Sequence, residues 1–168
     1  TLNRAYQSFR QPGSSIKPLI DYTPSLERNY TPDSSVNDHK FSGGPSNASG
    51  RYYGYVSLRF ALEQSLNTVA WQLFEELTPK VGLQYLLNMH FSKIVKKDYT
   101  NATSIGGLTY GCSALEMASG FATLENDGKF RDPTCIVKIL DSEGNTVVED
   151  HVDETYITIR RQLTQWLT

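Results

Sequence analysis

The sequence predicts a mainly α-helical fold with a small β-hairpin. Apolar residues recur at helical spacing in a series of segments, and most of these segments begin at a residue type that caps helices. One pair of β-branched runs flanks a polar turn late in the chain. With 168 residues, 39% of them hydrophobic and 20% charged, residues 1–168 are expected to form a single domain with a buried core. The predicted helices cover residues 14–22, 57–64, 68–77, 79–89, 113–126 and 154–167, and the hairpin covers 134–149.

The first predicted helix begins at a tight turn. Pro12-Gly13 is a strong break, and Ser14 follows it where an N-cap or first-turn residue would stand. Thr23-Pro24 is expected to end or bend this helix, because proline lacks the amide hydrogen that a helix interior needs.

Residues 29–53 are rich in Pro, Ser, Asn and Gly, which predicts turns rather than a core element. A loop of this length in a compact domain is usually functional or packed against another element. Ser57 is expected to cap the helix over 57–64, and Asn67 is expected to be the N-cap of the helix over 68–77.

The later helices carry clear start signals. Pro79 occupies the favoured first position of its helix, and Ser113 with Glu116 forms a capping box. Apolar spacing in the helix over 113–126 predicts that it buries Leu115, Ala118, Phe121, Ala122 and Leu124.

The end of the chain is predicted to hold the hairpin and a last helix. Residues 141–144 (DSEG) form the hairpin turn between the two β-branched runs. Asp153 is expected to cap an amphipathic helix whose inner face includes Tyr156 and Ile159.

Charge and cysteine content exclude several classes of function. A formal net charge of -2 gives no electrostatic reason to bind nucleic acid or an anionic membrane. Cys112 and Cys135 lack the spacing of a metal site or redox motif, which favours two buried free thiols over a disulfide. The histidines are scattered, so no metal site is expected. The chain has no long apolar run, so neither a transmembrane helix nor a secretory signal is expected within it. It opens on Thr1 rather than Met and its first motif follows almost at once, so it is expected to be a piece of a longer protein.

Ser14 and Lys17 have the spacing of a nucleophile and its base. Three residues apart, they lie on one helix face, one turn apart. A neutral lysine there accepts the serine proton, which is the Ser-Lys form of nucleophilic catalysis. Taken alone, the motif is more typical of a capped surface helix than of a catalytic site.

Ser65-Leu66-Asn67 is the second motif, and it falls between two predicted helices. A second hydroxyl can relay a proton between the lysine and a leaving amine, and a carboxamide can bind a substrate amide. Taken alone, it reads as an ordinary helix N-cap.

Together these motifs resemble the transpeptidase domain of class A (bifunctional) penicillin-binding proteins. The nucleophile segment of that family is similar to residues 10–18 (RQPGSSIKP), and the stretch into its Ser-x-Asn motif is similar to 53–67 (YGYVSLRFALEQSLN). Residues 105–107 (IGG) and 111–118 (GCSALEMA) resemble the segment before a buried helix of the fold. The Ser-x-x-Lys motif is characteristic of this superfamily.

The resemblance implies a serine-type D-Ala-D-Ala transpeptidase of peptidoglycan synthesis. Ser14 would attack the stem peptide, Lys17 would be the general base, Ser65 the proton relay, and Asn67 a ligand for the substrate amide. Peptidoglycan stem peptides and β-lactam antibiotics are the implied partners, without nucleic acid and without a metal or organic cofactor. The parent protein would act at the extracytoplasmic face of the bacterial membrane, held there only through segments absent from this chain.

One part of the family pattern is missing. None of the eight lysines precedes Thr-Gly or Ser-Gly, so the third motif of the family, Lys-Thr/Ser-Gly, is absent. The chain therefore resembles the helical part of the α/β penicillin-binding protein/serine β-lactamase-like transpeptidase fold, a partial domain expected to be inactive or impaired alone. A β-lactamase-like serine hydrolase and a non-catalytic helical interaction module remain the alternatives.

Overall fold

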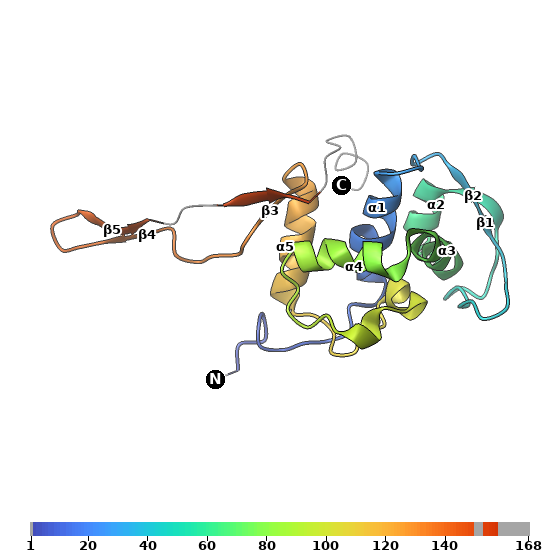
Figure 1. Ribbon diagram of the computed structural model, residues 1–168, viewed down its shortest axis with the longest axis horizontal. Coiled ribbons are helices and arrows are strands. Elements are labelled where there is room, and N and C mark those ends of the chain that lie inside the picture. The colour runs from blue at the N-terminus through green and yellow to red at the C-terminus, as the bar shows by residue number, and fades with distance from the viewer. Residues whose placement is uncertain (1, 150–152, 158–168) are drawn as a thin grey trace.

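The computed structural model describes residues 2–149 and 153–157, which form a helical body with three short pairs of strands (Figure 1). In chain order the elements are η1 Gly13–Ile16, η2 Pro18–Tyr22, α1 Thr23–Leu26, β1 Ser35–Asp38, β2 Gly54–Ser57, α2 Leu58–Glu63, α3 Asn67–Leu77, α4 Pro79–Asn88, η3 Lys96–Asp98, η4 Asn101–Ile105, α5 Ala114–Glu125, β3 Lys129–Arg131, β4 Lys138–Leu140, β5 Thr146–Glu149 and β6 Glu154–Tyr156.

The helical run from η1 to α1 lies at the centre of the body. Its η2 turn packs against α3 and α4, and α1 contacts both of these helices as well (Figure 1). Leu19 and Ile20 belong to one buried apolar cluster with α4, whereas Tyr22 and Leu26 belong to a second cluster with α2 and α3. Because both clusters share this run, its first turn is held rigidly in place.

Of the two outcomes predicted for Thr23-Pro24, an end or a bend, the end is wrong, because the π-helical turn η2 passes at Thr23 into the α-helix α1. η2 is a π-helical turn, in which the Thr23 N–H donates to the Pro18 carbonyl five residues earlier. The Thr23 hydroxyl also donates to this carbonyl, at 2.7 Å. The wider π-helical turn accommodates Pro24, which has no amide hydrogen to donate, and the chain continues as α1 to Leu26.

The starts of α2 and α4 follow the predictions, but that of α3 does not. The Ser57 hydroxyl accepts a hydrogen bond from the Phe60 N–H, and Pro79 opens α4. In α3 the N-cap residue is Leu66, and Asn67 is the first helical residue with its side chain turned elsewhere. The prediction that Asn67 caps this helix is therefore wrong.

The α5 helix begins as predicted but buries a different face. The Ser113 side chain accepts from the Glu116 N–H while the Glu116 carboxylate accepts from the Ser113 N–H, so the capping box is confirmed. Of the apolar residues predicted to be buried, only Leu124 is; Leu115, Ala118, Phe121 and Ala122 are exposed. Gly120 faces the core instead, and a Cβ there would lie 2.8 Å from the end of the Leu19 side chain, so a larger residue would force Leu19 to shift.

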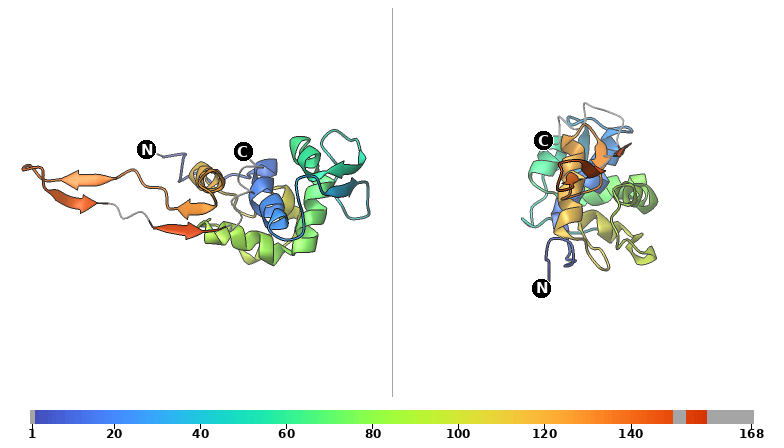
Figure 2. Two further views of the ribbon diagram at one scale, coloured as in Figure 1. Left: turned by 90° about the horizontal axis from the view of Figure 1, so that it is seen from above. Right: turned by 90° about the vertical axis from the view of Figure 1, so that its left-hand side faces the viewer.

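The β4–β5 hairpin confirms the predicted turn at 141–144 and projects away from the helical body. The β1–β2 pair lies at the opposite end of the body (Figures 1 and 2). This pair is antiparallel and aligns Ser35 with Ser57. The expectation of turns alone over 29–53 is therefore wrong for β1.

Residues 154–156 contradict the predicted last helix. They form β6, antiparallel to β3, and the Glu154 carboxylate pairs with Lys129 and Arg131 across the ladder. A neighbouring strand overrides local helical spacing here. The rest of the helix predicted over 154–167, from residue 158 on, lies outside the described residues. Both cysteines are free, but only Cys112 is buried, and the prediction of a buried Cys135 is wrong.

Candidate active site

Ser14 and Lys17 occupy the start of the central helical run. Ser14 lies within the 3₁₀ turn η1, and the Lys17 N–H donates to the Ser14 carbonyl. In a 3₁₀ turn, side chains three residues apart eclipse one another. Ser14 is exposed whereas Lys17 is completely buried, so an accessible hydroxyl stands one turn before a lysine that is shielded from water.

The neighbouring serine is already engaged. The Ser15 hydroxyl donates to the Pro12 carbonyl at 2.7 Å. Among the described residues, the Ser14 hydroxyl has no hydrogen-bond partner, which leaves it available to a substrate. Of the two serines, Ser14 therefore has the geometry of a nucleophile.

Three oxygen atoms surround the Lys17 amine. Its Nζ donates to the Ser65 carbonyl at 2.7 Å, to the Asn67 Oδ1 at 2.7 Å and to the Ser65 Oγ at 3.1 Å. The structure thus brings together Lys17, Ser65 and Asn67, with Ser14 one turn away on the helical run. Asn67 also donates through Nδ2 to the Ser46 carbonyl at 2.9 Å, so it touches Lys17 through one end of its amide and the 46–47 segment through the other.

Ser65 reaches Lys17 through an unusual backbone conformation. Its φ is 51°, in the left-handed region that non-glycine residues rarely adopt. It lies in the connection between α2 and α3, where both its carbonyl and its hydroxyl meet Lys17 Nζ. Backbone strain of this kind costs about 1–3 kcal/mol and clusters at functional sites.

Burial and one neighbouring carboxyl set the charge of Lys17. Burial lowers the pKa of Lys17 to about 8, and Asp21 opposes this by favouring the charged form. Asp21 is itself fully buried, and burial raises its pKa well above the usual range, against the opposing effect of Lys17. Neither Asp21 carboxyl oxygen has a hydrogen-bond partner among the described residues. Asp21 was not predicted as a site residue, although its position one turn beyond Lys17 indicates that the two side chains share a helix face.

The connection between η4 and α5 holds the turn that carries Ser14. Arg10 and Cys112 exchange backbone hydrogen bonds of 3.0 and 2.9 Å. The Gln11 side chain accepts from the Leu108 N–H at 2.8 Å and donates to the Leu108 carbonyl. These contacts fix the chain on both sides of residues 10–11 and therefore fix where the helical run begins.

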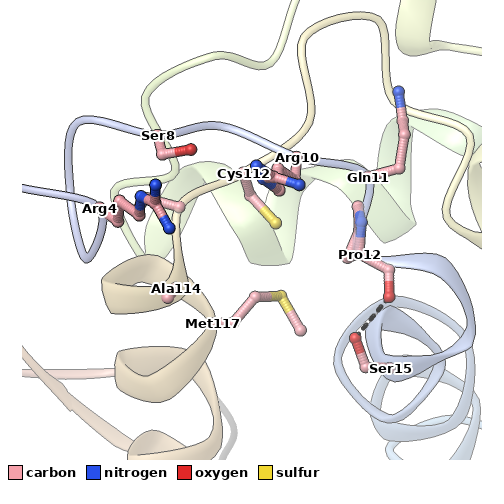
Figure 3. Close-up of a pocket in the computed structure, with 10 residues that line it drawn as sticks. Arg4, Ser8, Arg10, Gln11, Pro12, Ser15, Cys112, Ala114 and Met117 are labelled. Atoms are coloured by element: carbon pink, nitrogen blue, oxygen red, sulfur yellow. Dashed lines mark hydrogen bonds between the residues drawn. The ribbon is translucent and has the colours of Figure 1, made fainter.

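A cavity of about 520 Å³ opens beside this turn (Figure 3). Arg4 and Arg10 contribute its positive charge, Ser15 forms part of its wall next to Pro12, and Cys112 and Met117 line it from the α5 side. Ser14 and Lys17 are not part of its lining, so the cavity adjoins the Lys17 centre without containing it.

The geometry suits proton transfer at a serine hydroxyl. A neutral Lys17 has two N–H groups, which match the two carbonyl-type acceptors, Ser65 O and Asn67 Oδ1. Its lone pair then remains to accept a proton from a hydroxyl, as a general base must. Within the described ranges, no three His, Cys, Asp or Glu side chains gather in a way that would hold a metal ion. None of the helices described there is long and apolar enough to cross a membrane.

Comparison with known proteins gives a consistent family. The family model for the penicillin binding protein transpeptidase domain matches residues 1–164. Penicillin-binding protein 4 of Bacillus subtilis is 38% identical over 149 residues, which is 86% of this chain and 24% of that protein. Penicillin-binding protein 1F of B. subtilis is 34% identical over 163 residues, or 95% of this chain and 22% of that protein. The chain thus spans about a quarter of the length of these relatives.

Solved structures agree with the sequence matches. Penicillin-binding protein 1A from Haemophilus influenzae superposes with a TM-score of 0.76 at 30% identity, covering 91% of this chain and 24% of that one. The PonA1 protein from Mycobacterium tuberculosis, solved in complex with penicillin V, gives a TM-score of 0.82 at 20% identity and covers 100% of this chain and 48% of that one. The second likeness shows the fold alone.

Proposed function

The chain belongs to the transpeptidase domain family of penicillin-binding proteins, and we propose that its Ser14–Lys17–Ser65–Asn67 centre performs serine acyl transfer on D-Ala-D-Ala stem peptides. The observation that carries the proposal is the fully buried Lys17 amine, held by Ser65 and Asn67 and with a pKa lowered to about 8. A lysine in this state is a base near neutral pH, one turn from an unengaged serine hydroxyl.

The proposed reaction has two acyl-transfer steps. The Ser14 oxygen forms a bond to the peptide carbonyl carbon as its proton passes to Lys17 Nζ. The carbon–nitrogen bond to the terminal D-Ala then breaks, and the departing amine takes a proton relayed from Lys17 through the Ser65 hydroxyl, 3.1 Å from Nζ. In the second step the amine of another strand forms a bond to the acyl carbon and gives a proton to the neutral Lys17 Nζ. The bond between this carbon and the Ser14 oxygen breaks, and Lys17 passes the proton to that oxygen, which regenerates the Ser14 hydroxyl and the neutral amine.

Asn67 has two roles in this proposal. Its Oδ1 holds Lys17, and the second hydrogen on its Nδ2 is available to a substrate carbonyl while the first is donated to Ser46. β-Lactams would acylate Ser14 as substrate mimics. We place the parent protein at the extracytoplasmic face of the bacterial membrane, where its stem-peptide substrate is found.

Mass spectrometry of the intact chain after prolonged incubation with benzylpenicillin tests the nucleophile. We expect a stable adduct of one penicillin on the wild type and on Ser15→Ala, and none on Ser14→Ala, because only Ser14 has a free hydroxyl one turn before Lys17. Ser15→Ala is the matched control, one residue away in the same turn.

The time course separates the other functions. An adduct that forms and then disappears would indicate a β-lactamase-like hydrolase. A wild type that never forms an adduct would favour a non-catalytic helical module. Loss of the adduct in Ser15→Ala with retention in Ser14→Ala would refute the assignment of the nucleophile.

A further inference from the structure

A cluster of buried polar side chains lies behind Asn67, outside the centre described above. Asp38 and Thr68 have no exposed surface, and Asn47 is 4% exposed. Asp38 ends β1, Asn47 lies in the connection between β1 and β2, and Thr68 is in the first turn of α3. Buried polar groups of this kind are stable only when every member finds partners.

Asn47 caps the α3 helix from outside it. Its Oδ1 accepts from the backbone N–H groups of Asn67 and Thr68, at 2.8 and 3.3 Å. The residue before the helix, Leu66, has no side chain able to do this. Asn47 therefore satisfies amide hydrogens that the first helical turn leaves free.

Asp38 fixes which way the Asn47 amide points. The Asp38 Oδ1 accepts from Asn47 Nδ2 at 2.7 Å and from the Thr68 hydroxyl, and its Oδ2 accepts from the Tyr53 N–H at 2.8 Å. Because an ionised carboxylate only accepts hydrogen bonds, the Asn47 NH₂ group must face it. The Asn47 oxygen is thereby turned toward the start of α3.

The same segment also binds the Asn67 side chain. Asn67 Nδ2 donates to the Ser46 carbonyl, which directs Oδ1 of this amide to Lys17 Nζ. Residues 46 and 47 thus hold both the backbone and the side chain of the residue that contacts the lysine.

We propose that Asp38 and Asn47 are positioning residues that hold the start of α3 so that Asn67 and Ser65 keep their oxygens on Lys17. Neither touches the reacting atoms; both act through Asn67. The catalytic consequence rests on the proposed acyl transfer, whereas the positioning of Lys17 can be tested without it. Displacing a catalytic group by about 1 Å can reduce a rate by about 10²-fold.

NMR of the full chain reads the positioning directly. In Asn47→Ala we expect amide hydrogen exchange at Asn67 and Thr68 to accelerate by about 2- to 30-fold, the range that corresponds to the loss of an N-cap. We also expect the ¹³Cε resonance of Lys17, assigned with Lys17→Met, to shift as Asn67 leaves Nζ. Asn101→Ala is the matched control, because Asn101 makes one exposed amide hydrogen bond, to Glu75.

A charge swap separates positioning from packing. Asn47→Asp is nearly isosteric but sets two carboxylates against each other where the 2.7 Å hydrogen bond stood, so it should reproduce the Lys17 shift. Asp38→Asn combined with Asn47→Asp restores a donor–acceptor pair between residues 38 and 47. It leaves the Arg51 carbonyl, now bonded to Asn47 Nδ2 at 2.9 Å, without its donor, and the Thr68 hydroxyl without the Asp38 Oδ1 acceptor. The double variant should recover most of the wild-type Lys17 resonance and at least tenfold of any lost acylation rate. If Asn47→Ala does not fold, Asn47→Asp and the double variant still test whether residues 38 and 47 position Lys17.

The outcomes are distinct. A Lys17 resonance that stays at its wild-type position in Asn47→Ala or Asn47→Asp overturns the inference, whatever happens to stability. A shift that the swap reverses supports it. If the Lys17 resonance shifts in the variants but the wild-type chain never reacts with benzylpenicillin, the positioning is supported and the proposed function is refuted.

Discussion

Few groups surround the Lys17 amine, and these groups determine its protonation state. Its Nζ has oxygen acceptors at 2.7, 2.7 and 3.1 Å, and its side chain is closed to solvent. Among the titratable groups described, Asp21 is the one that shifts its pKa, and it lies one helical turn away. Removing that carboxyl therefore has a definite sign.

Asp21→Asn should lower the pKa of Lys17 below its wild-type value of about 8. An ionised Asp21 stabilises the ammonium form, so its loss leaves burial, which favours the neutral amine, unopposed. We expect the ¹³C NMR titration of Lys17 and the rising limb of the acylation rate against pH to move to lower pH together. The rising limb is assigned to Lys17 because only its neutral form accepts the Ser14 proton.

Asp33→Asn is the control for this experiment, because Asp33 is exposed. Tyr22, the other group whose pKa Asp21 shifts, is buried and protonated throughout this range. An unmoved Lys17 titration in Asp21→Asn would show that Asp21 is already protonated where Lys17 titrates, contrary to the prediction.

Among the site residues, local relationships could be predicted from the sequence and long-range contacts could not. The Ser14-x-x-Lys17 spacing predicts a shared face because it depends only on local helix geometry. The partners of Asn67 could not be predicted, because Asn47 reaches it across a 20-residue separation set by the path of the 39–53 connection. The local signal at Asn67, a good N-cap residue, pointed to a different role.

At the scale of elements, two loops meet at the nucleophile turn. Gly106 has a φ of +90°, and a Cβ placed there would lie 2.3 Å from the Gly13 Cα. The turn after η4 therefore packs directly on the backbone before Ser14. Backbone atoms cannot move aside as a side chain can, so the contact requires glycine.

Gly106→Ala should destabilise the chain by about 2–4 kcal/mol, combining backbone strain with overpacking. We also expect a fall in acylation rate among the molecules that remain folded, because the collision displaces the turn that carries Ser14. Urea unfolding gives the stability, and the initial rate with a fluorescent penicillin gives the second effect.

Gly144→Ala is the matched control for this substitution. Gly144 also has a positive φ, +84°, but a Cβ there meets nothing within 4 Å. This variant isolates the conformational penalty of a left-handed alanine, about 1–2 kcal/mol, and should leave acylation unchanged. Equal losses in the two variants would show that the approach of Gly106 to Gly13 is unimportant.

Elements were predictable where their signals are local. The caps at Ser57 and Ser113 and the turn at 141–144 use side chains and backbone conformations within a few residues. The buried face of α5 could not be predicted from local signals, because it depends on the approach of Gly120 to Leu19 on another helix. Likewise β6 exists because β3 offers a ladder and a cation pair for Glu154.

At the scale of the whole molecule, the described residues bring together one part of the proposed acyl-transfer site. The proposed nucleophile, base and relay lie on the helical run that begins with η1 and on the α2–α3 connection, beside the buried cluster of Asp38, Asn47 and Thr68. The 168 residues contain no Lys-Thr-Gly or Lys-Ser-Gly sequence, the element that by family resemblance completes the oxyanion hole and binds the substrate carboxylate.

The 168-residue chain should therefore acylate slowly. Loss of a single oxyanion donor reduces a rate by about 10²–10³-fold, and water reaching the exposed Ser14 weakens each remaining electrostatic interaction. We expect its second-order rate with a fluorescent penicillin to lie at least about 10²-fold below that of a full-length relative under the same conditions. Ser14→Ala sets the background, and denatured chain controls for non-specific labelling. A rate equal to that of the relative would mean that the Lys17 centre forms a complete site within these residues.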